Sequence, residues 1–477
     1  MFSRSSNARR TIAVTAVAAL ALVAAACGAS GGGDDASDSD GTTTTAAGSA
    51  SSTKWGDLDS PCGDGDFTVA PGEGSATDKL ILGVPNDRGA EIRPGLNKEL
   101  WDASVAFTDW CNDQGGIGGL QIELLDMDGK LFQVEAAMAS ACDTAFAMVG
   151  GAFTQDNLSF TGKDGSDFHR CGLIDIPAFA VSVQKSMSNG QVQPIPNPAD
   201  KKSEQWIMDF KALYPEESAE NVVVTGELPS MEVVHMQYDA AVQAVGGIEQ
   251  LKPLTYPVTG MADWTPLARS VIDSGAGSLY WIGEPGNAGN LLAKLREQGW
   301  KGVALNEANV YDEVFFSQGA AAVDGAVVRL AVHPFEEADK WPAIKQYQDN
   351  LKKYVTDGKE AALGLQSTSA WLLFATAAKE CGEANDGVIS RDCVLEKAAA
   401  QSDWTAGGTH VPTDPGSGEP PECGMLMVVK GDGFERLWPE IGGEDDDLDG
   451  FHCPADSIAT VTAELPAEGV VDPDRKI

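Results

Sequence analysis

The sequence predicts an α/β protein with two doubly wound parallel-sheet lobes joined by a hinge. Residues 79–128 have the pattern of a strand, a crossover helix and a second strand, which is the unit of a parallel sheet. The same alternation resumes after a proline-rich segment at 192–198, as expected for a second sheet. With 477 residues, the chain is also too long for one ordinary hydrophobic core.

The first group of elements covers residues 79–196. Short apolar runs predict strands, and amphipathic stretches between them predict helices. The predicted strands span 80–84, 120–125, 146–150 and 173–179, and the predicted helices span 96–111 and 133–144, with a further helix after the loop 151–156.

The second group repeats this alternation over residues 197–330. Its predicted strands lie at 221–225, near 254, at 278–283 and at 302–305, and its helices lie at 203–213, after 229, at 264–274 and up to 298. Residues 327–332 are expected to return the chain to the first lobe, where helices at 341–354 and 363–381 pack. Two last strands, 424–430 and 434–438, precede an acidic tail (441–477) that we expect to be irregular.

The N-terminus has the pattern of an exported chain. Three arginines precede an apolar run at 11–26, which ends at Cys27 after three alanines. The run is short and ends in small residues, so it indicates a secretory signal peptide rather than a spanning helix. The ending 23–27 resembles a bacterial lipobox, in which the cysteine is acylated. An ordinary secretory signal with an incidental cysteine is the alternative.

Residues 27–53 are predicted to be a flexible tether, because 28–53 contain only Gly, Ala, Ser, Asp and Thr. Residues 54–78 are expected to be an N-terminal extension pinned by Cys62. We therefore predict a protein anchored to the outer face of the cell membrane through lipid on Cys27. No other segment is apolar for long enough to cross a bilayer.

The chain is strongly acidic, with a formal net charge of −38. This charge argues against binding to nucleic acid and against docking on anionic lipid. Solubility in a salty exterior is the simplest interpretation, and the acidity says little about a ligand.

Eight cysteines besides Cys27 support export, because an even number in an exported chain indicates disulfides. Connectivity does not follow from sequence alone, but several of these cysteines fall at helix ends or strand starts on one edge of the predicted sheet. No CxxC pair occurs, so thiol–disulfide catalysis has no motif. The pairs we expect are Cys62–Cys111, Cys142–Cys171, Cys381–Cys393 and Cys423–Cys453.

A glycine-rich turn at 112–119 (NDQGGIGG) lies between an amphipathic helix and a strand that ends at Asp126 and Asp128. Its glycines let the helix stop and the chain reverse at positive φ. This pattern resembles the extracellular solute-binding proteins of the branched-chain amino acid type, over about residues 79–440. The resemblance implies a type I periplasmic-binding-protein fold in a monomer that traps a small-molecule solute and delivers it to the permease subunits of an ABC importer.

The resemblance also implies the division into lobes, with 192–198 as the first hinge crossing. Lobe 1 would consist of 79–196 and 331–410, and lobe 2 of 197–330 and 411–440.

Candidate ligand-binding residues follow the predicted strands, because ligands of such sheets bind beyond the carboxyl ends of the strands. Asp87 and Arg88 follow the first strand, and Thr154 and Gln155 follow the third. The helix predicted next would favour an anion at its N-terminus. The family uses a hydroxyl residue here for the α-carboxylate of an amino acid, and Thr154 matches that place. A plain helix cap made by Asp156 is the alternative.

Three further candidates complete the predicted site. Ser182 corresponds loosely to small hydroxyl groups that the family uses after the next strand. Glu307 lies two residues past a strand end, where the family places a carboxylate against the ammonium of the ligand; a solvated loop acid is the alternative. Glu284 stands where the family usually has an aromatic ring, a departure that argues against an aliphatic amino acid. Amino acids, amides, urea-like molecules and small carboxylates all fit such a site.

We predict no enzyme and no cofactor. The five histidines are scattered, and neither HExxH nor GxSxG nor a phosphate-loop pattern appears. A ligand-binding receptor or sensor lipoprotein that is not coupled to transport is the alternative function.

The acidic tail contains a weak calcium-loop pattern. The spacing of its acids and of Gly450 matches a loop that wraps a hard cation. However, the last acid is not the bidentate Glu and no flanking helices are evident, so a solvated charge run is the alternative, and we predict no metal. The acids concerned are Asp445, Asp447, Asp449 and Asp456.

Overall fold

The computed structural model describes residues 53–74, 78–157 and 171–465. All of these belong to one unit of the chain, 51–477. The predicted signal peptide, the tether and Cys27 lie outside the described residues, as does most of the helix predicted after 151–156.

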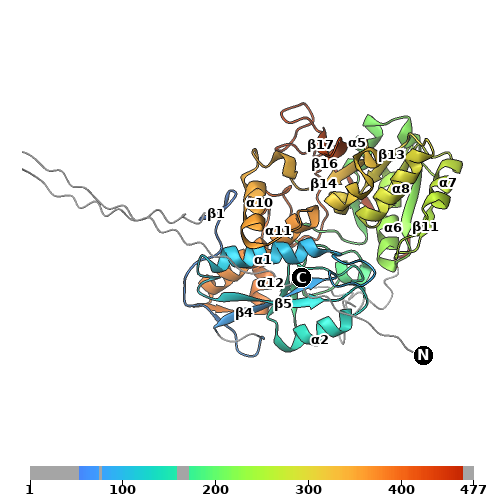
Figure 1. The fold of residues 1–477 in the computed structure, drawn as a ribbon. Helices are drawn as coiled ribbons and strands as arrows, with labels where there is room; N and C mark the ends of the chain where they lie inside the picture. Colours follow the sequence, from blue (N-terminus) through green and yellow to red (C-terminus); the bar gives the residue numbers. More distant parts are fainter. Residues whose placement is uncertain (1–52, 75–77, 158–170, 466–477) are drawn as a thin grey trace, which may run out of the picture. The chain divides into compact units, whose positions relative to one another are not determined.

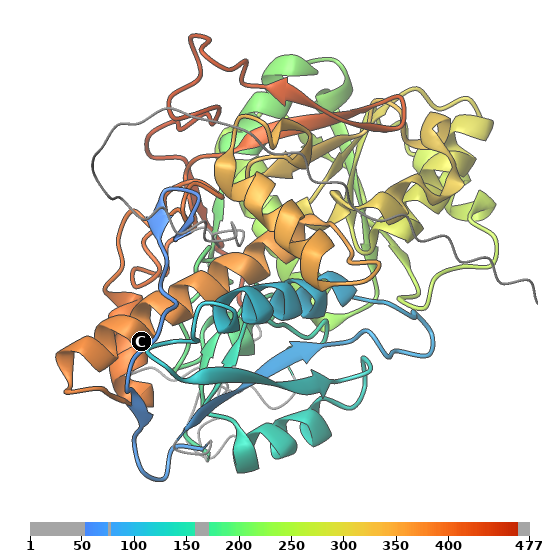
Figure 2. The same cartoon turned by 60° about the vertical axis from the view of Figure 1, so that its left-hand side comes forward.

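The first sheet is parallel and has the order β5 (Gln121–Asp128), β4 (Lys79–Asn86), β6 (Ala147–Val149), β7 (Ile174–Ile176). Leu80, Leu82 and Val84 of β4 are fully buried, which matches the apolar run that predicted this strand. Helices α1 (Lys98–Asn112) and α11 (Ala362–Ala384) cover one face of the sheet, and α2 (Val134–Thr144) covers the other (Figures 1 and 2). The chain therefore winds in both directions from β4, as in a doubly wound fold.

The second sheet is mainly parallel. Its strands β9, β12, β13 and β14 run in this order and parallel, whereas β16 and β17 extend the edge in antiparallel fashion. Short strands β10 and β11 pair with the other side of β9. The bounds are β9 (Glu220–Gly226), β10 (Glu249–Gln250), β11 (Leu254–Tyr256), β12 (Ser278–Ile282), β13 (Val303–Asn306), β14 (Val327–Leu330), β16 (Met425–Lys430) and β17 (Gly433–Trp438).

Alternating side chains bury both faces of this sheet. Val222, Leu279 and Trp281 point into the core that α7 (Thr265–Asp273) and α8 (Pro285–Glu297) share, whereas Val223 and Tyr280 point into the core that α5 (Gln205–Leu213) and α6 (Pro229–Val245) share. This period of two, with apolar residues on both faces, is typical of a central parallel strand. The predicted α/β fold with two doubly wound sheets is confirmed.

The remaining helices pack mainly on the first sheet. α10 (Pro342–Tyr354) lies against α1, and α12 (Arg391–Ala399) lies against α11. The short elements are β1 (Lys54–Trp55), β2 (Leu58–Asp59), β3 (Thr68–Val69), β8 (Lys201–Ser203), β15 (Val388–Ile389), β18 (Ile458–Thr460), α4 (Val183–Ser186) and α9 (Ala320–Val323), together with the 3-10 turns η1 (Glu217–Ala219), η2 (Ala308–Val310), η3 (Glu313–Gln318) and η4 (Phe335–Glu337). No helix in the described ranges combines the length and apolarity needed to cross a bilayer.

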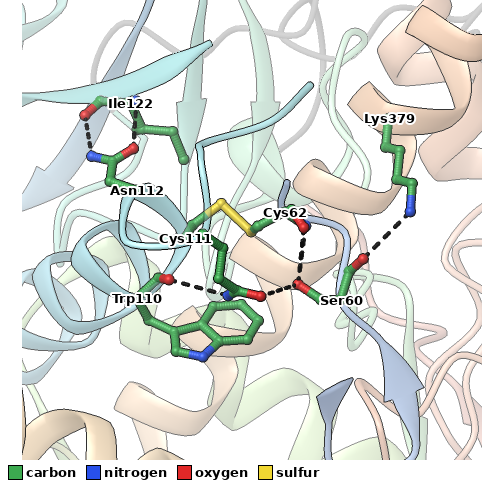
Figure 3. Close-up of a disulfide and its surroundings, with 8 residues drawn as sticks. Ser60, Cys62, Trp110, Cys111, Asn112, Ile122 and Lys379 are labelled. Carbon is green, nitrogen blue, oxygen red and sulfur yellow. Dashed lines mark hydrogen bonds between the residues drawn. A yellow bond between two sulfur atoms is a disulfide. The ribbon is translucent and has the colours of Figure 1, made fainter. Parts of the chain in front are cut away.

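The glycine turn at 112–119 receives the N-terminal extension. Gly119 has φ 90°, and a Cβ there would lie 2.0 Å from the carbonyl oxygen of Gly65, so only glycine fits. Asn112 closes the turn, because its side-chain amide both donates to and accepts from the backbone of Ile122 (Figure 3). The signature turn thus positions α1, β5 and the extension together.

The Cys62–Cys111 disulfide fastens that extension to the end of α1 (Figure 3). Ser60 donates to Gln114 nearby, and β3 pairs in parallel with β15. The structure contains all four expected disulfides, so the predicted connectivity is confirmed: Cys62–Cys111, Cys142–Cys171, Cys381–Cys393 and Cys423–Cys453.

Chain crossings between the two sheets are tied to one another. Val332 and His410 form an antiparallel bridge. The hydroxyl of Thr413 donates to the carbonyl oxygen of Pro194 at 2.6 Å, which links the proline-rich crossing to the last one. The lobe boundaries predicted from the sequence stay a prediction, but these contacts show that the crossings lie side by side.

The acidic tail is more ordered than the sequence indicated. β18 pairs antiparallel with β8, and His452 Nδ1 lies 2.8 Å from Asp209 Oδ1. The expectation of an irregular tail is therefore wrong over 458–460, because a strand partner distant in sequence stabilises this segment. In the calcium-loop pattern, Asp447 accepts a hydrogen bond from the backbone N–H of Cys453. Within the described ranges, no three His, Cys, Asp or Glu side chains gather to hold a metal ion.

Candidate ligand-binding site

A cavity of about 240 Å³ lies at the carboxyl ends of strands from both sheets. The segments after β6 and β7 line it from the first sheet, and those after β12 and β13 line it from the second. Its position matches the rule that doubly wound sheets bind ligands where the strand order reverses. The polar lining residues include Asn97, Thr154, Asn197, Lys202, Ser203, Gln205, Ser230, Glu284, Glu307, Asn309, Arg329 and Gln366.

Apolar side chains from both lobes form much of the wall. Such a surface gains free energy when it covers the hydrocarbon part of a ligand. These side chains are Leu96, Phe179, Val181, Ile195, Trp206, Met231, Val234, Ile282, Leu330 and Leu363.

One end of the cavity carries a buried charge cluster around Glu307. Arg329 donates through Nε to Glu307 Oε2 at 2.7 Å, and its Nη2 also contacts Oε2. The Lys202 ammonium lies 3.2 Å from Oε1, and the Tyr280 hydroxyl donates to the same oxygen. The Arg329 guanidinium also lies over the Trp206 ring, 5.2 Å from its centroid.

These contacts shift the titration of the acid and of the lysine in the cluster. Burial alone would raise the pKa of Glu307, but Arg329 and Lys202 outweigh it and lower this pKa to about 2. Burial, together with the nearby charge of Arg329, lowers the pKa of Lys202 to about 8. At neutral pH the cluster therefore holds two cations and one carboxylate.

Two contacts join the sheets across the cavity. Glu284, at the start of α8, forms an ion pair with Arg93, which follows β4. The hydroxyl of Ser230, in α6, donates to the carbonyl oxygen of Thr154 at 3.2 Å. These groups hold the lobes together around the cavity.

Comparisons with known proteins agree with this geometry. A family model described as periplasmic binding protein matches residues 217–434. Among solved structures, a leucine-binding protein from Thermotoga maritima superposes with a TM-score of 0.60 at 16% identity, over 76% of this chain and 97% of that chain. This is the fold of the type I periplasmic binding proteins.

Two other structures show the same periplasmic-binding-protein fold. A fatty acid ABC transporter substrate-binding protein from Thermomonospora curvata has a TM-score of 0.64 at 14% identity, covering 79% of this chain and 95% of that chain. A branched-chain amino acid transporter substrate-binding protein from Streptococcus pneumoniae, in complex with isoleucine, has a TM-score of 0.59 at 15% identity. This match covers 76% of this chain and 100% of that chain. No curated protein sequence gives a match. The resemblance to this type of binding protein is confirmed at the level of the fold.

Within this binding-protein fold, three of the seven predicted ligand-binding residues line the cavity, namely Thr154, Glu284 and Glu307. Thr154 Oγ1 accepts from the Asn97 amide at 3.2 Å. Their roles toward a ligand stay predictions.

The other four predicted residues do not line this cavity, and their polar groups are engaged elsewhere within the protein. Asp87 is fully buried and accepts from the backbone N–H groups of Leu131 and Thr154, both at 2.7 Å. Asp87 therefore positions the loop that carries Thr154. The others pair as follows: Arg88 with Asp126, Gln155 with the carbonyl oxygen of Leu131, and Ser182 as the cap of α4.

Sequence reasoning missed the two cations of the charge cluster. Arg329 had a recognisable signal, because it interrupts the otherwise apolar run Val327–Leu330 and therefore needs a partner. Lys202 had none, since it stands beside Lys201 in a polar stretch. Only the folded chain brings Lys202, Glu307 and Arg329 together.

Proposed function

We propose that this chain is the solute-binding component of an ABC importer, which captures a small organic solute between two hinged lobes. The observation that supports this most directly is the cavity lined by strand ends of both sheets. Closure is driven by a ligand only if the ligand gains contacts from both lobes in the closed state. Asn97 and Thr154 on one side, and Lys202 and Arg329 on the other, provide such contacts.

The solute class proposed from the sequence is an amino acid or an amide-like molecule. The similar structures include a leucine-binding protein, a fatty acid transporter substrate-binding protein and a substrate-binding protein in complex with isoleucine. Those ligands share a carboxylate and an aliphatic body, and the cavity offers both cationic and apolar groups. We therefore extend the proposed class to small carboxylates with an apolar body.

In the proposed cycle, the chain is anchored outside the cell membrane through lipid on Cys27 and acts as a monomer. Open lobes admit the solute, polar groups of the first lobe hold it, and the second lobe closes over it. The closed form then docks on the permease subunits, so the chain performs no chemistry on its ligand.

Two measurements test this proposal. Thermal shift against amino acids, amides, ureas and carboxylates identifies a ligand, and small-angle X-ray scattering with that ligand measures closure. Uptake of the labelled ligand by cells that lack the chain, complemented with wild type or with Cys27→Ala, then tests transport and anchoring. Binding and closure without any loss of uptake on deletion would favour a sensor instead.

A further inference from the structure

We infer that the preferred ligand carries a carboxylate and no amine, and that Lys202 and Arg329 hold this carboxylate with help from Ser203. The inference rests on the proposed function and narrows its solute class. It differs from the sequence expectation that Glu307 receives a ligand ammonium.

Around Glu307, the cavity wall carries more positive than negative charge. Its ionisable lining side chains within the described ranges are Lys202, Arg329, Glu284 and Glu307. Glu284 is neutralised by Arg93, so Glu307 alone faces two cations. The side chain of Lys202 is only 4% exposed, and a buried charge is costly unless it is paired. A ligand anion would supply the missing negative charge.

The acceptor positions of Glu307 are already occupied by groups of the protein. A carboxylate offers about four acceptor positions. Lys202 and Tyr280 contact Oε1, and the guanidinium of Arg329 contacts Oε2 through two nitrogens. A ligand ammonium at Glu307 would have to displace one of these groups. The ammonium of Lys202 therefore occupies the position on Glu307 that the ammonium of an amino acid ligand would otherwise take.

Several hydrogen-bond donors at this end of the cavity are left for a ligand. The Ser203 hydroxyl is buried, lines the cavity and has no hydrogen-bond partner among the described residues. Ammonium and guanidinium groups carry three and five N–H donors, respectively, more than Glu307 can accept. Adjacent Lys202 and Ser203, with Arg329, thus offer a ligand carboxylate several donors within one cavity.

The apolar wall described above accounts for the rest of the ligand. A charged head at Lys202 and Arg329 leaves a hydrocarbon body to contact side chains such as Trp206, Met231 and Ile282. An aliphatic monocarboxylate matches this division, because its apolar part needs no polar partner.

The test compares three ligands that differ only at the head group. Leucine has both charges, 4-methylpentanoate lacks the amine, and 3-methylbutylamine lacks the carboxylate. Isothermal titration calorimetry with the purified full chain at pH 7 should show 4-methylpentanoate binding at least tenfold more tightly than leucine, with no binding of the amine.

Matched lysine variants locate the contact. Lys202→Met should weaken binding of 4-methylpentanoate at least tenfold and reduce its advantage over leucine. Lys201→Met is the control, because Lys201 pairs with Glu419 and lines a different cavity, so both affinities should stay unchanged. Ser203→Ala should cost several-fold in carboxylate affinity and provides a second variant if Lys202→Met does not fold.

The outcomes separate this inference from the proposed function. Tighter binding of leucine or of the amine would overturn the inference but would leave solute capture intact. The inference would also be overturned, with solute capture intact, if 4-methylpentanoate failed to bind while an amide or another solute in the thermal-shift panel bound and closed the lobes. Failure of every panel member to bind or to close the lobes would overturn both.

Discussion

The two sheets of this protein share a winding pattern but contribute different chemistry to the cavity between them. The first sheet presents neutral groups to the cavity. Among them, Asn97 and Thr154 are polar and are hydrogen-bonded to each other. The second presents Glu307 and Arg329, and Lys202 of the short strand β8 pairs with Glu307 beside them. The difference lies in the partners of one carboxylate in each lobe. Asp87 accepts hydrogen bonds from backbone N–H groups, whereas Glu307 forms ion pairs with side-chain cations. One scaffold thus supports two kinds of site wall, because loops and strand ends vary independently of the sheet.

The largest expected effect comes from removing the acid of the second lobe. Glu307→Gln leaves the buried Lys202 and the partly exposed Arg329 without their carboxylate, and removing one partner of a buried ion pair costs about 3–5 kcal/mol in free energy of unfolding. Denaturant unfolding with the disulfides intact measures this loss. Glu435→Gln is the control, since its pair with Lys430 is exposed to solvent and such pairs contribute little to stability. Equal effects of the two substitutions would contradict the role given to Glu307.

The corresponding acid of the first lobe is expected to have a smaller effect. Asp87→Asn removes the charge that accepts from Leu131 and Thr154 N–H groups, and the amide nitrogen then faces a donor, which costs about 2 kcal/mol. Ligand affinity should fall as well, because the Thr154 loop loses its support. Thermal unfolding and calorimetry on the same variant report both effects. A variant with lower stability but unchanged affinity would separate Asp87 from the site.

The pH dependence of ligand affinity should come from the second lobe alone, because Lys202 belongs to it. Lys202 binds an anion when it is protonated, and its pKa is about 8 in the free protein. As pH rises above 8 the free protein loses this proton, so carboxylate affinity should fall by up to about tenfold per pH unit, until the pKa of the complex is reached. Calorimetry between pH 6.5 and 9.5 measures the slope. Lys202→Met should abolish this dependence, and a slope that persists in that variant would assign it to another group.

The smallest expected effect concerns the ion pair between the lobes. Arg93→Met removes the partner of Glu284, so the closed conformation loses an ion pair between the lobes and the equilibrium shifts toward open lobes. Ligand affinity should weaken less than tenfold, and scattering should show a larger radius of gyration without ligand. Lys294→Met, in α8 but paired with Glu297 on the surface, should change neither quantity.

Much of the fold could be predicted because it depends on local patterns. The strand–helix–strand unit at 79–128, the turn glycines and the alternation of the second lobe follow from hydrophobic periodicity and from the backbone freedom of glycine. Even the disulfides could be paired, since helix ends and strand starts place several cysteines on one edge of a sheet.

The site was less predictable because its residues are distant in sequence. Thr154 and Glu307 could be found as residues that follow strands, but Asp87 and Ser182 equally follow strands and serve the backbone instead. No local pattern distinguishes these cases. The difference depends on which acceptors and donors the neighbouring loops bring within hydrogen-bond distance.

The sequence by itself therefore determined the two sheets and their helices, since each follows from the order of apolar, polar and glycine residues along the chain. The disulfide pairs were an expectation that the structure confirmed. Only the tertiary structure decided that Lys202 and Arg329 converge on Glu307, that β18 pairs with β8, and that Glu284 meets Arg93. The physical reason is that burial and charge pairing are properties of neighbours in space. Those neighbours come from elements that are far apart in the sequence, so no local pattern links them.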